Sequence, residues 1–121
     1  MSAEVIELFV GDLTPIKNVR PDFPGVEDLL DVNWVCQTSV VDCDNAEVVA
    51  PRGVTGKTVD SSGRERFSVS IFAAETALLT IPEGEGYVDY YWIIEITNAT
   101  TVPPFAREAR ITLRVRAQGI P

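Results

Sequence analysis

The sequence contains no histidine among its 121 residues. Histidine is the side chain whose charge changes near neutral pH, so its absence removes the commonest general base. The Ser-His-Asp and Cys-His nucleophile systems are also excluded, as are the zinc sites that use imidazole ligands. We therefore expect no enzyme of the histidine-dependent classes.

Cysteine is almost as scarce, and Cys36 and Cys43 are the only two. Two thiolates alone do not complete a tetrahedral structural zinc site. Cys36 lies in the alternating segment "VNWVCQTSVV", where a buried free thiol is the usual state. A Cys36–Cys43 disulfide across the turn between them is the alternative, and a reducing cytoplasm disfavours it.

Long apolar runs are missing as well. No stretch approaches the roughly 18 apolar residues of a membrane-spanning helix, and "MSAEVIELFVGD" lacks the basic segment that begins a secretory signal. A length of 121 residues predicts one domain, spanning 1–121, that buries a core without metals or disulfides. We expect synthesis in the cytoplasm and no membrane partner.

Basic residues are few, and the net charge is −8. This charge argues against nucleic acid as a partner, because phosphate binding needs clustered lysine and arginine. Residues 1–106 carry 6 basic and 17 acidic side chains, whereas residues 107–121 contain four arginines and one acidic residue. Two interpretations follow for the four arginines Arg107, Arg110, Arg114 and Arg116. They either bind an acidic surface of another molecule, or form a solvated strand face balanced by acids on the adjacent strand.

The segment "GVTGKT" at 53–58 resembles the end of a phosphate-binding loop. That loop needs a glycine five positions before its second glycine, and the residue there is Pro51, which has no N–H to donate. The next residues predict a turn and a strand rather than a helix. We interpret 53–58 as a connection between strands.

The acidic residues do not form a recognisable catalytic or metal-binding set. Asp42 and Asp44 lie in a turn whose sequence lacks the ligand array of a calcium loop. Asp89 and Glu95 share one strand face but lie more than about 15 Å apart, at roughly 3.3 Å per residue. No cofactor, no metal and no catalytic residue are predicted.

Short alternating segments separated by Gly, Pro and Asn predict an all-β fold, an antiparallel immunoglobulin-like β-sandwich with long irregular loops and at most one short helix. Helical turns are expected near 25–30 and over 73–81, and the chain between 11 and 29 is expected to be largely irregular. The predicted strands are 4–10, 15–20, 30–42, 47–51, 56–60, 64–73, 87–97 and 107–118. Alternation predicts these inward-facing residues: Val32, Trp34, Cys36, Thr38, Val40, Phe67, Val69, Ile71, Val88, Tyr90, Trp92, Ile94, Ile96, Ile111, Leu113 and Val115.

Aromatic residues gather in "YVDYYW" at 87–92. Tyr87 and Tyr91 alternate with the core positions, so they either contact a partner or are ordinary half-exposed sheet residues. The proline-rich loops 11–29 and 98–106 are further candidates for contacts. The complete set of candidate interface residues is Tyr87, Tyr91, Arg107, Arg110, Arg114, Arg116, Pro103, Pro104 and Phe105.

The order of "FVGDLTPI", "DLLD", "AETALL", "EGEGYVDYYW" and "REARITLRV" resembles small immunoglobulin-like proteins of tailed-bacteriophage particles, of the type at the N-terminus of baseplate upper proteins and in related tail or head accessory proteins. The long 13–29 connection and the two prolines of "TVPPFARE" depart from that pattern. The positions that carry the resemblance are Gly11, Asp12, Pro15, Asp28 to Asp31, Thr76, Leu79, Gly86, Tyr87 and Ile111 to Val115.

This resemblance implies a non-enzymatic virion protein, made in the host cytoplasm. It implies assembly with other virion proteins and with copies of itself, through loops and strand edges, in the tail, baseplate, neck or capsid decoration. The alternative is a carbohydrate- or ligand-binding β-sandwich that uses Tyr87, Tyr91 and nearby acids.

Overall fold

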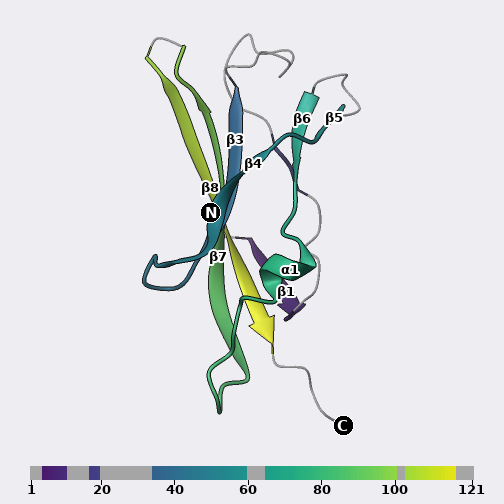
Figure 1. Ribbon diagram of the computed structural model, residues 1–121, viewed down its shortest axis with the longest axis vertical. Coiled ribbons are helices and arrows are strands. Elements are labelled where there is room, and N and C mark those ends of the chain that lie inside the picture. Colours follow the sequence, from purple (N-terminus) through teal and green to yellow (C-terminus); the bar gives the residue numbers. More distant parts are fainter. Residues whose placement is uncertain (1–3, 11–16, 20–33, 60–64, 101–102, 117–121) are drawn as a thin grey trace.

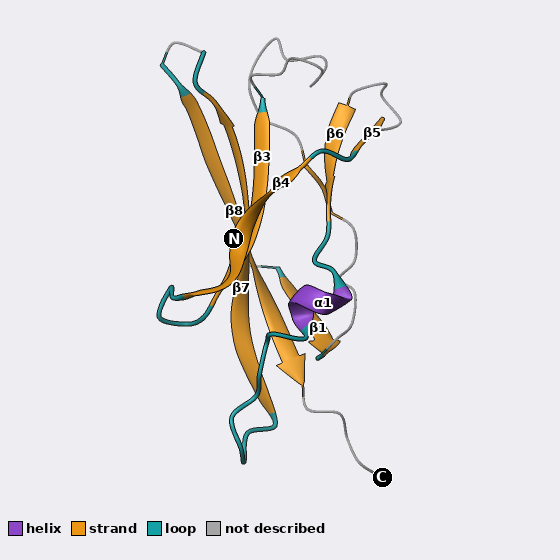
Figure 2. Ribbon diagram, in the orientation of Figure 1, coloured by secondary structure: helices purple, strands orange, loops and turns teal. Residues whose placement is uncertain are grey.

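The computed structural model describes residues 4–10, 17–19, 34–59, 65–100 and 103–116. Within these ranges the protein is mostly β, with a single short helix, α1 (Ala73–Thr76) (Figure 2). The strands are β1 (Val5–Phe9), β2 (Lys17–Val19), β3 (Val35–Val41), β4 (Glu47–Val54), β5 (Lys57–Val59), β6 (Glu65–Val69), β7 (Tyr87–Asn98) and β8 (Phe105–Arg116).

The strands form two sheets. One has five strands in the order β1-β8-β7-β3-β4, and the other has three in the order β2-β6-β5. In Figure 1 the labelled β5, β6 and α1 all lie on the same side of β7 and β8. The opposite side of the five-stranded sheet carries none of these elements.

The β1–β8 pair differs from the antiparallel expectation, because these two strands run parallel. Val5 lies opposite Thr112 and Phe9 opposite Arg116, and the Thr112 N–H donates a 2.9 Å hydrogen bond to the Glu4 carbonyl. Alternating polarity specifies which face of a strand is buried but not which way its neighbour runs. The prediction of a purely antiparallel fold is therefore wrong at this edge.

The core follows the predicted alternation closely. Every predicted inward position that the structure describes is buried, except Val88, which is half-buried and packs against the cluster. Val32 and the expected turn near 25–30 lie outside the described residues. Phe67, Val69 and Ile71, from β6 and the residues just after it, share one apolar cluster with residues of the five-stranded sheet. Residues from both sheets therefore build a common core.

A buried polar pair lies inside this cluster. The Trp92 indole Nε1–H donates a 2.6 Å hydrogen bond to Thr38 Oγ1, and that hydroxyl donates a 3.1 Å bond to the Ile93 carbonyl. Trp92 is fully buried and Thr38 is only 1% exposed. A buried indole N–H needs an acceptor, so the threonine hydroxyl stabilises the tryptophan in the core.

Helix α1 is shorter than the predicted 73–81 segment, and a turn at 77–78 leads on to the buried Leu79. The Phe72 N–H donates to Glu75 Oε1 at 2.9 Å, which satisfies one N-terminal donor of the helix. Arg52 of β4 reaches the same carboxylate with two 2.9 Å bonds and donates a 2.7 Å bond to the Ser70 carbonyl. Its guanidinium also lies 4.1 Å from the Phe72 ring centroid. Arg52 thus ties an edge strand of one sheet to the chain between β6 and α1.

The β7–β8 hairpin extends further than the sequence indicated. The strands run through Asn98 and resume at Phe105, with Asn98 opposite Phe105. The predicted loop 98–106 is therefore wrong at both ends. Asn98 Oδ1 accepts hydrogen bonds from the N–H and the hydroxyl of Thr100, at 2.9 and 2.6 Å, which turns the chain after β7.

Candidate functional site

The hairpin register brings the predicted tyrosines and three of the predicted arginines together. Tyr87 lies opposite Arg116, and Ile93 lies opposite Arg110. Because side chains alternate across a strand, these positions all lie on the face of the five-stranded sheet away from the core. We call this surface the Tyr–Arg face, and it consists of Tyr87, Asp89, Tyr91, Ile93 and Glu95 on β7 with Glu108, Arg110, Thr112, Arg114 and Arg116 on β8.

Arginine guanidinium groups lie over both tyrosine rings of the face. Arg114 and Arg116 lie 4.6 and 5.6 Å from the centroid of Tyr87, and Arg110 lies 5.4 Å from that of Tyr91. These are cation–π distances. The rings and cations therefore order one another, and Tyr87 nevertheless keeps 46% of its surface exposed.

Acidic side chains pair with the arginines at the end of this face where β7 begins and β8 ends, beside Tyr87 and Arg116. Arg114 binds Asp89 through two hydrogen bonds of 2.9 and 3.1 Å, and Arg116 Nη2 donates to Glu7 of β1 at 2.7 Å. The hydrogen bond from Arg116 lowers the pKa of Glu7, and the bond to Asp89 raises the pKa of Arg114. This arrangement supports the interpretation of a strand face balanced by acids on adjacent strands.

The opposite end of the same face, toward the turn between β7 and β8, carries two glutamates. Glu95 lies directly opposite Glu108. Glu108 contacts Arg110 at 3.4 Å, with both side chains more than 40% exposed, and Arg110 also donates a 2.9 Å bond to Asn45. Glu95 forms no ion pair with any residue in the part of the chain that the structure describes.

The remaining predicted interface residues lie elsewhere. Phe105 begins β8, is half-buried and packs edge-on against Trp34, with ring centroids 5.4 Å apart. Arg107 lies 6.0 Å from the Phe105 centroid, and Pro103 and Pro104 are exposed just before the strand. The structure thus separates this group, at the hairpin tip, from the Tyr–Arg face.

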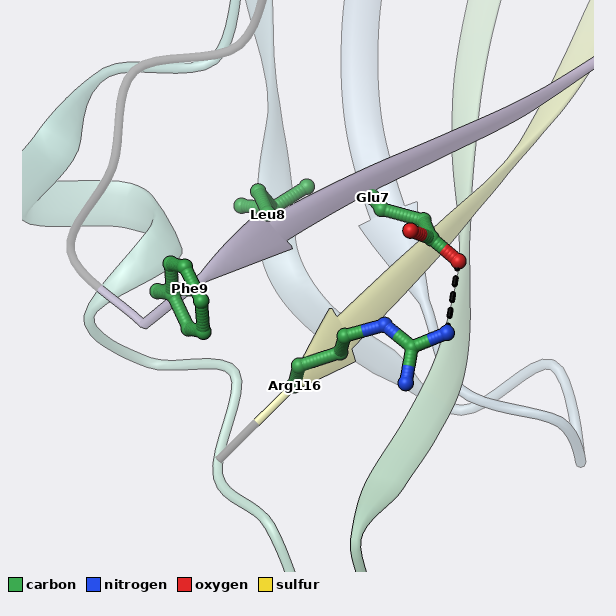
Figure 3. A pocket seen from close by; sticks show the side chains of 4 residues that line it. All are labelled: Glu7, Leu8, Phe9 and Arg116. Carbon is green, nitrogen blue, oxygen red and sulfur yellow. Dashed lines mark hydrogen bonds and ion pairs between the residues drawn. The ribbon is translucent and has the colours of Figure 1, made fainter. Parts of the chain in front are cut away.

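A shallow pocket of about 270 Å³ opens between β1 and β8, lined by Glu7, Leu8, Phe9 and Arg116 (Figure 3). Its charged groups are already bound to each other, as the dashed line between Glu7 and Arg116 shows. Sequence reasoning did not include Glu7 in the candidate site. Only the parallel register of β1 on β8 places it beside Arg116, which is 109 residues later.

The segments considered for nucleotide or metal binding have structural roles in the described chain. Within the predicted connection 53–58, Gly53 and Val54 end β4 and Lys57 begins β5, so only Thr55 and Gly56 connect the two strands. The Gly56 carbonyl accepts a 2.9 Å bond from the Ser68 N–H. Asp42 Oδ1 accepts bonds from the N–H groups of Asp44 and Ala46, so it organises its own turn. Among the described residues, no three His, Cys, Asp or Glu side chains group as a metal site.

Both cysteines are free thiols, Cys36 buried and Cys43 exposed, which confirms the buried-thiol interpretation. No helix in the described ranges has the length and apolar character needed to cross a membrane. Comparisons with protein-family models, with curated proteins and with solved structures found no match for the chain.

Proposed function

We propose that this chain is a non-enzymatic, immunoglobulin-like β-sandwich that serves as a structural or adaptor protein of a tailed-bacteriophage particle. The sequence resemblance suggests the particle. The strand order supports the fold, because β8-β7-β3-β4 against β2-β6-β5 follows the arrangement of an immunoglobulin variable-type domain. Tyr90, near the start of β7, donates a 2.6 Å bond to the Thr80 carbonyl upstream, as in a tyrosine corner.

The Tyr–Arg face is the observation that carries the binding role. Tyrosine and arginine are the residue types enriched at protein interfaces and at their energetic centres. Here two tyrosines and three arginines are held in fixed positions by cation–π contacts and ion pairs. Because their rotamers are already restricted, a partner loses less side-chain entropy on binding them. We therefore assign assembly contacts to this face.

Quantitative mass spectrometry of density-purified particles tests the proposal. We expect the chain in particles at a fixed ratio to the major shell protein. A ratio near one indicates capsid decoration, and a few copies per particle indicate the neck, tail or baseplate. Absence of the chain from particles would refute the virion role.

A pair of variants tests the face itself. Tyr87→Ala with Tyr91→Ala should reduce incorporation into particles, whereas Leu78→Ala should not. Leu78 is a matched control because it is a large exposed side chain, 54% accessible, beside α1 and away from the face. Equal incorporation of both variants would show that the Tyr–Arg face makes no assembly contact.

Carbohydrate binding is the alternative that exposed tyrosines suggest. Sugar stacking needs an open aromatic ring face, and guanidinium groups already lie over Tyr87 and Tyr91. This geometry favours a protein partner over a glycan. Saturable binding on a glycan array, lost in Tyr91→Ala, would reverse that preference.

A further inference from the structure

A groove opens where the chain passes from one sheet to the other. β4 ends at Val54, and two residues lead from it to β5 in the second sheet, as Figure 1 shows. The groove has a volume of about 390 Å³ and is lined by residues 52–56 together with Ser68, Ser70 and Phe72. This volume lies in the range of ligand pockets, about 300–1,000 Å³. The groove shares no residue with the Tyr–Arg face.

The Ser70 N–H is an unpartnered backbone donor on this groove. The Ser68 N–H bonds to the Gly56 carbonyl, on the β5 side of β6. Successive residues of an extended chain direct their backbone groups to opposite edges, so Ser70 directs its own to the same side as Ser68. The Ser70 carbonyl accepts a 2.7 Å bond from Arg52 Nη2, whereas its N–H makes no hydrogen bond within the described ranges.

The Arg52 guanidinium supplies further unused donors. Its Nε and Nη2 bind Glu75 and the Ser70 carbonyl, and Nη1 makes no hydrogen bond to any described residue. Arg52 is the only charged residue among the described residues that line the groove, and the ion pair with Glu75 neutralises it. A free anion would therefore gain little there for its lost hydration, and the donors fit an uncharged acceptor such as a peptide carbonyl.

Two glycines of the groove have no role in the described fold that requires glycine. Neither Gly53 nor Gly56 has a positive φ. A Cβ atom at Gly53 would meet no described atom within 4 Å, and one at Gly56 would meet the Ser68 carbonyl oxygen at an ordinary 3.7 Å. Glycine weakens a strand, but it also lets a ligand or another backbone approach closely. The bare backbone of Gly53 and Gly56 therefore suits a molecule that enters from outside.

We propose that this groove binds an extended peptide segment of a partner protein. One peptide carbonyl accepts the Ser70 N–H, and a second acceptor binds Arg52 Nη1. The glycines let the peptide backbone come close, and an apolar peptide side chain packs on Phe72, which is 50% exposed. An extended segment presents backbone carbonyls at a regular spacing, so a single segment satisfies both sets of donors. The site is independent of the virion proposal.

Selection from a yeast-displayed random peptide library against the full chain tests this inference. An enriched peptide is then synthesised, and its affinity is measured by fluorescence anisotropy. In Gly53→Val the new side chain occupies the groove without meeting a described atom, and a β-branched residue suits a strand. We expect unchanged or higher stability in urea, with peptide affinity reduced by about tenfold or more because contacts and hydrogen bonds are lost.

Gly86→Val is the matched control. A Cβ atom at Gly86 also meets nothing described within 4 Å, and the residue lies outside the groove, just before β7. This variant should bind the peptide like the parent chain. In the ¹⁵N-labelled parent, the peptide should shift the Ser70 amide resonance and slow its hydrogen exchange, because the N–H gains an acceptor.

Three results would overturn the inference: no peptide enriched over background, equal affinity for the parent and Gly53→Val, and a Ser70 amide that the peptide leaves unchanged. If Gly53→Val instead loses stability, Phe72→Ala decides the question, because its ring is half exposed and lies outside the core cluster. Peptide affinity equal to the parent in Phe72→Ala would then refute the site.

Discussion

The buried Trp92–Thr38 hydrogen bond allows a quantitative prediction about stability. Thr38→Val preserves the side-chain shape but removes the hydroxyl that accepts the 2.6 Å bond from the indole. The buried N–H would then lack a partner, which costs about 1–3 kcal/mol. The added methyl group returns up to about 0.8 kcal/mol. We expect a net loss of about 1–2 kcal/mol in the free energy of unfolding.

Urea denaturation followed by tryptophan fluorescence measures this loss. With a slope of about 1–3 kcal/mol per molar urea, the midpoint should fall by roughly 1 M. Trp92→Phe provides the second arm of a double-mutant cycle, and Trp34 remains as the fluorescent probe. In the Trp92→Phe background no indole N–H remains to be orphaned, so Thr38→Val should cost little.

The cycle should therefore give a coupling energy of about 1–2 kcal/mol between the two positions. The reasoning fails if Thr38→Val is as stable as the parent chain, because the hydroxyl then contributes nothing. An equal loss in both backgrounds also refutes it, since the cost would come from packing rather than from the hydrogen bond.

Three further predictions concern other parts of the core and its rim. Tyr90→Phe removes a 2.6 Å bond to the backbone before β7 and should lower the unfolding free energy by about 1 kcal/mol, measured in urea; no change would show that the hydroxyl is dispensable. The hydrogen bond from Arg52 lowers the pKa of Glu75 in the folded chain. The ionised Glu75 therefore stabilises the fold fully at a pH above its unfolded-state pKa near 4.5, and this stabilisation is lost as the pH falls through the lower folded-state pKa. The stability difference between the parent and Glu75→Gln should thus be largest at pH 7 and shrink in acid, and a difference independent of pH would contradict this assignment. Burial raises the pKa of the Cys36 thiol to about 12, so a thiol reagent at pH 8 should modify only Cys43 in the folded chain and both thiols in denaturant; rapid native reaction at two thiols would contradict the burial of Cys36.

The alternating polarity of the sequence predicted the core with few errors, because the side-chain period of a strand is a local property. Trp92, Leu113 and Phe67 are each buried where alternation placed them. The ends of elements were less predictable. β8 begins at Phe105, which pairs with Asn98 and whose ring packs on Trp34, and no local pattern indicates either contact.

The sequence predicted only some of the residues of the candidate site. Tyr87, Tyr91, Arg110, Arg114 and Arg116 were identified because they alternate with core residues. The acidic partners of these arginines, Asp89 and Glu7, were not identified. Each of the two reaches its arginine through a different strand pairing. The antiparallel register of the β7–β8 hairpin places Asp89 directly opposite Arg114. Glu7 requires the parallel edge pairing, which the sequence pattern does not encode.

The sequence by itself determined which side chains face inward, and it placed tyrosines and arginines on the opposite side of the same strands. Burial of apolar surface is non-directional, so this pattern specifies faces but not neighbours. Only the tertiary structure decided the neighbours. The parallel pairing of β1 with β8 and the register of Glu95 on Glu108 depend on hydrogen-bonded ladders between distant segments, and these ladders fix where each charge of the face lies.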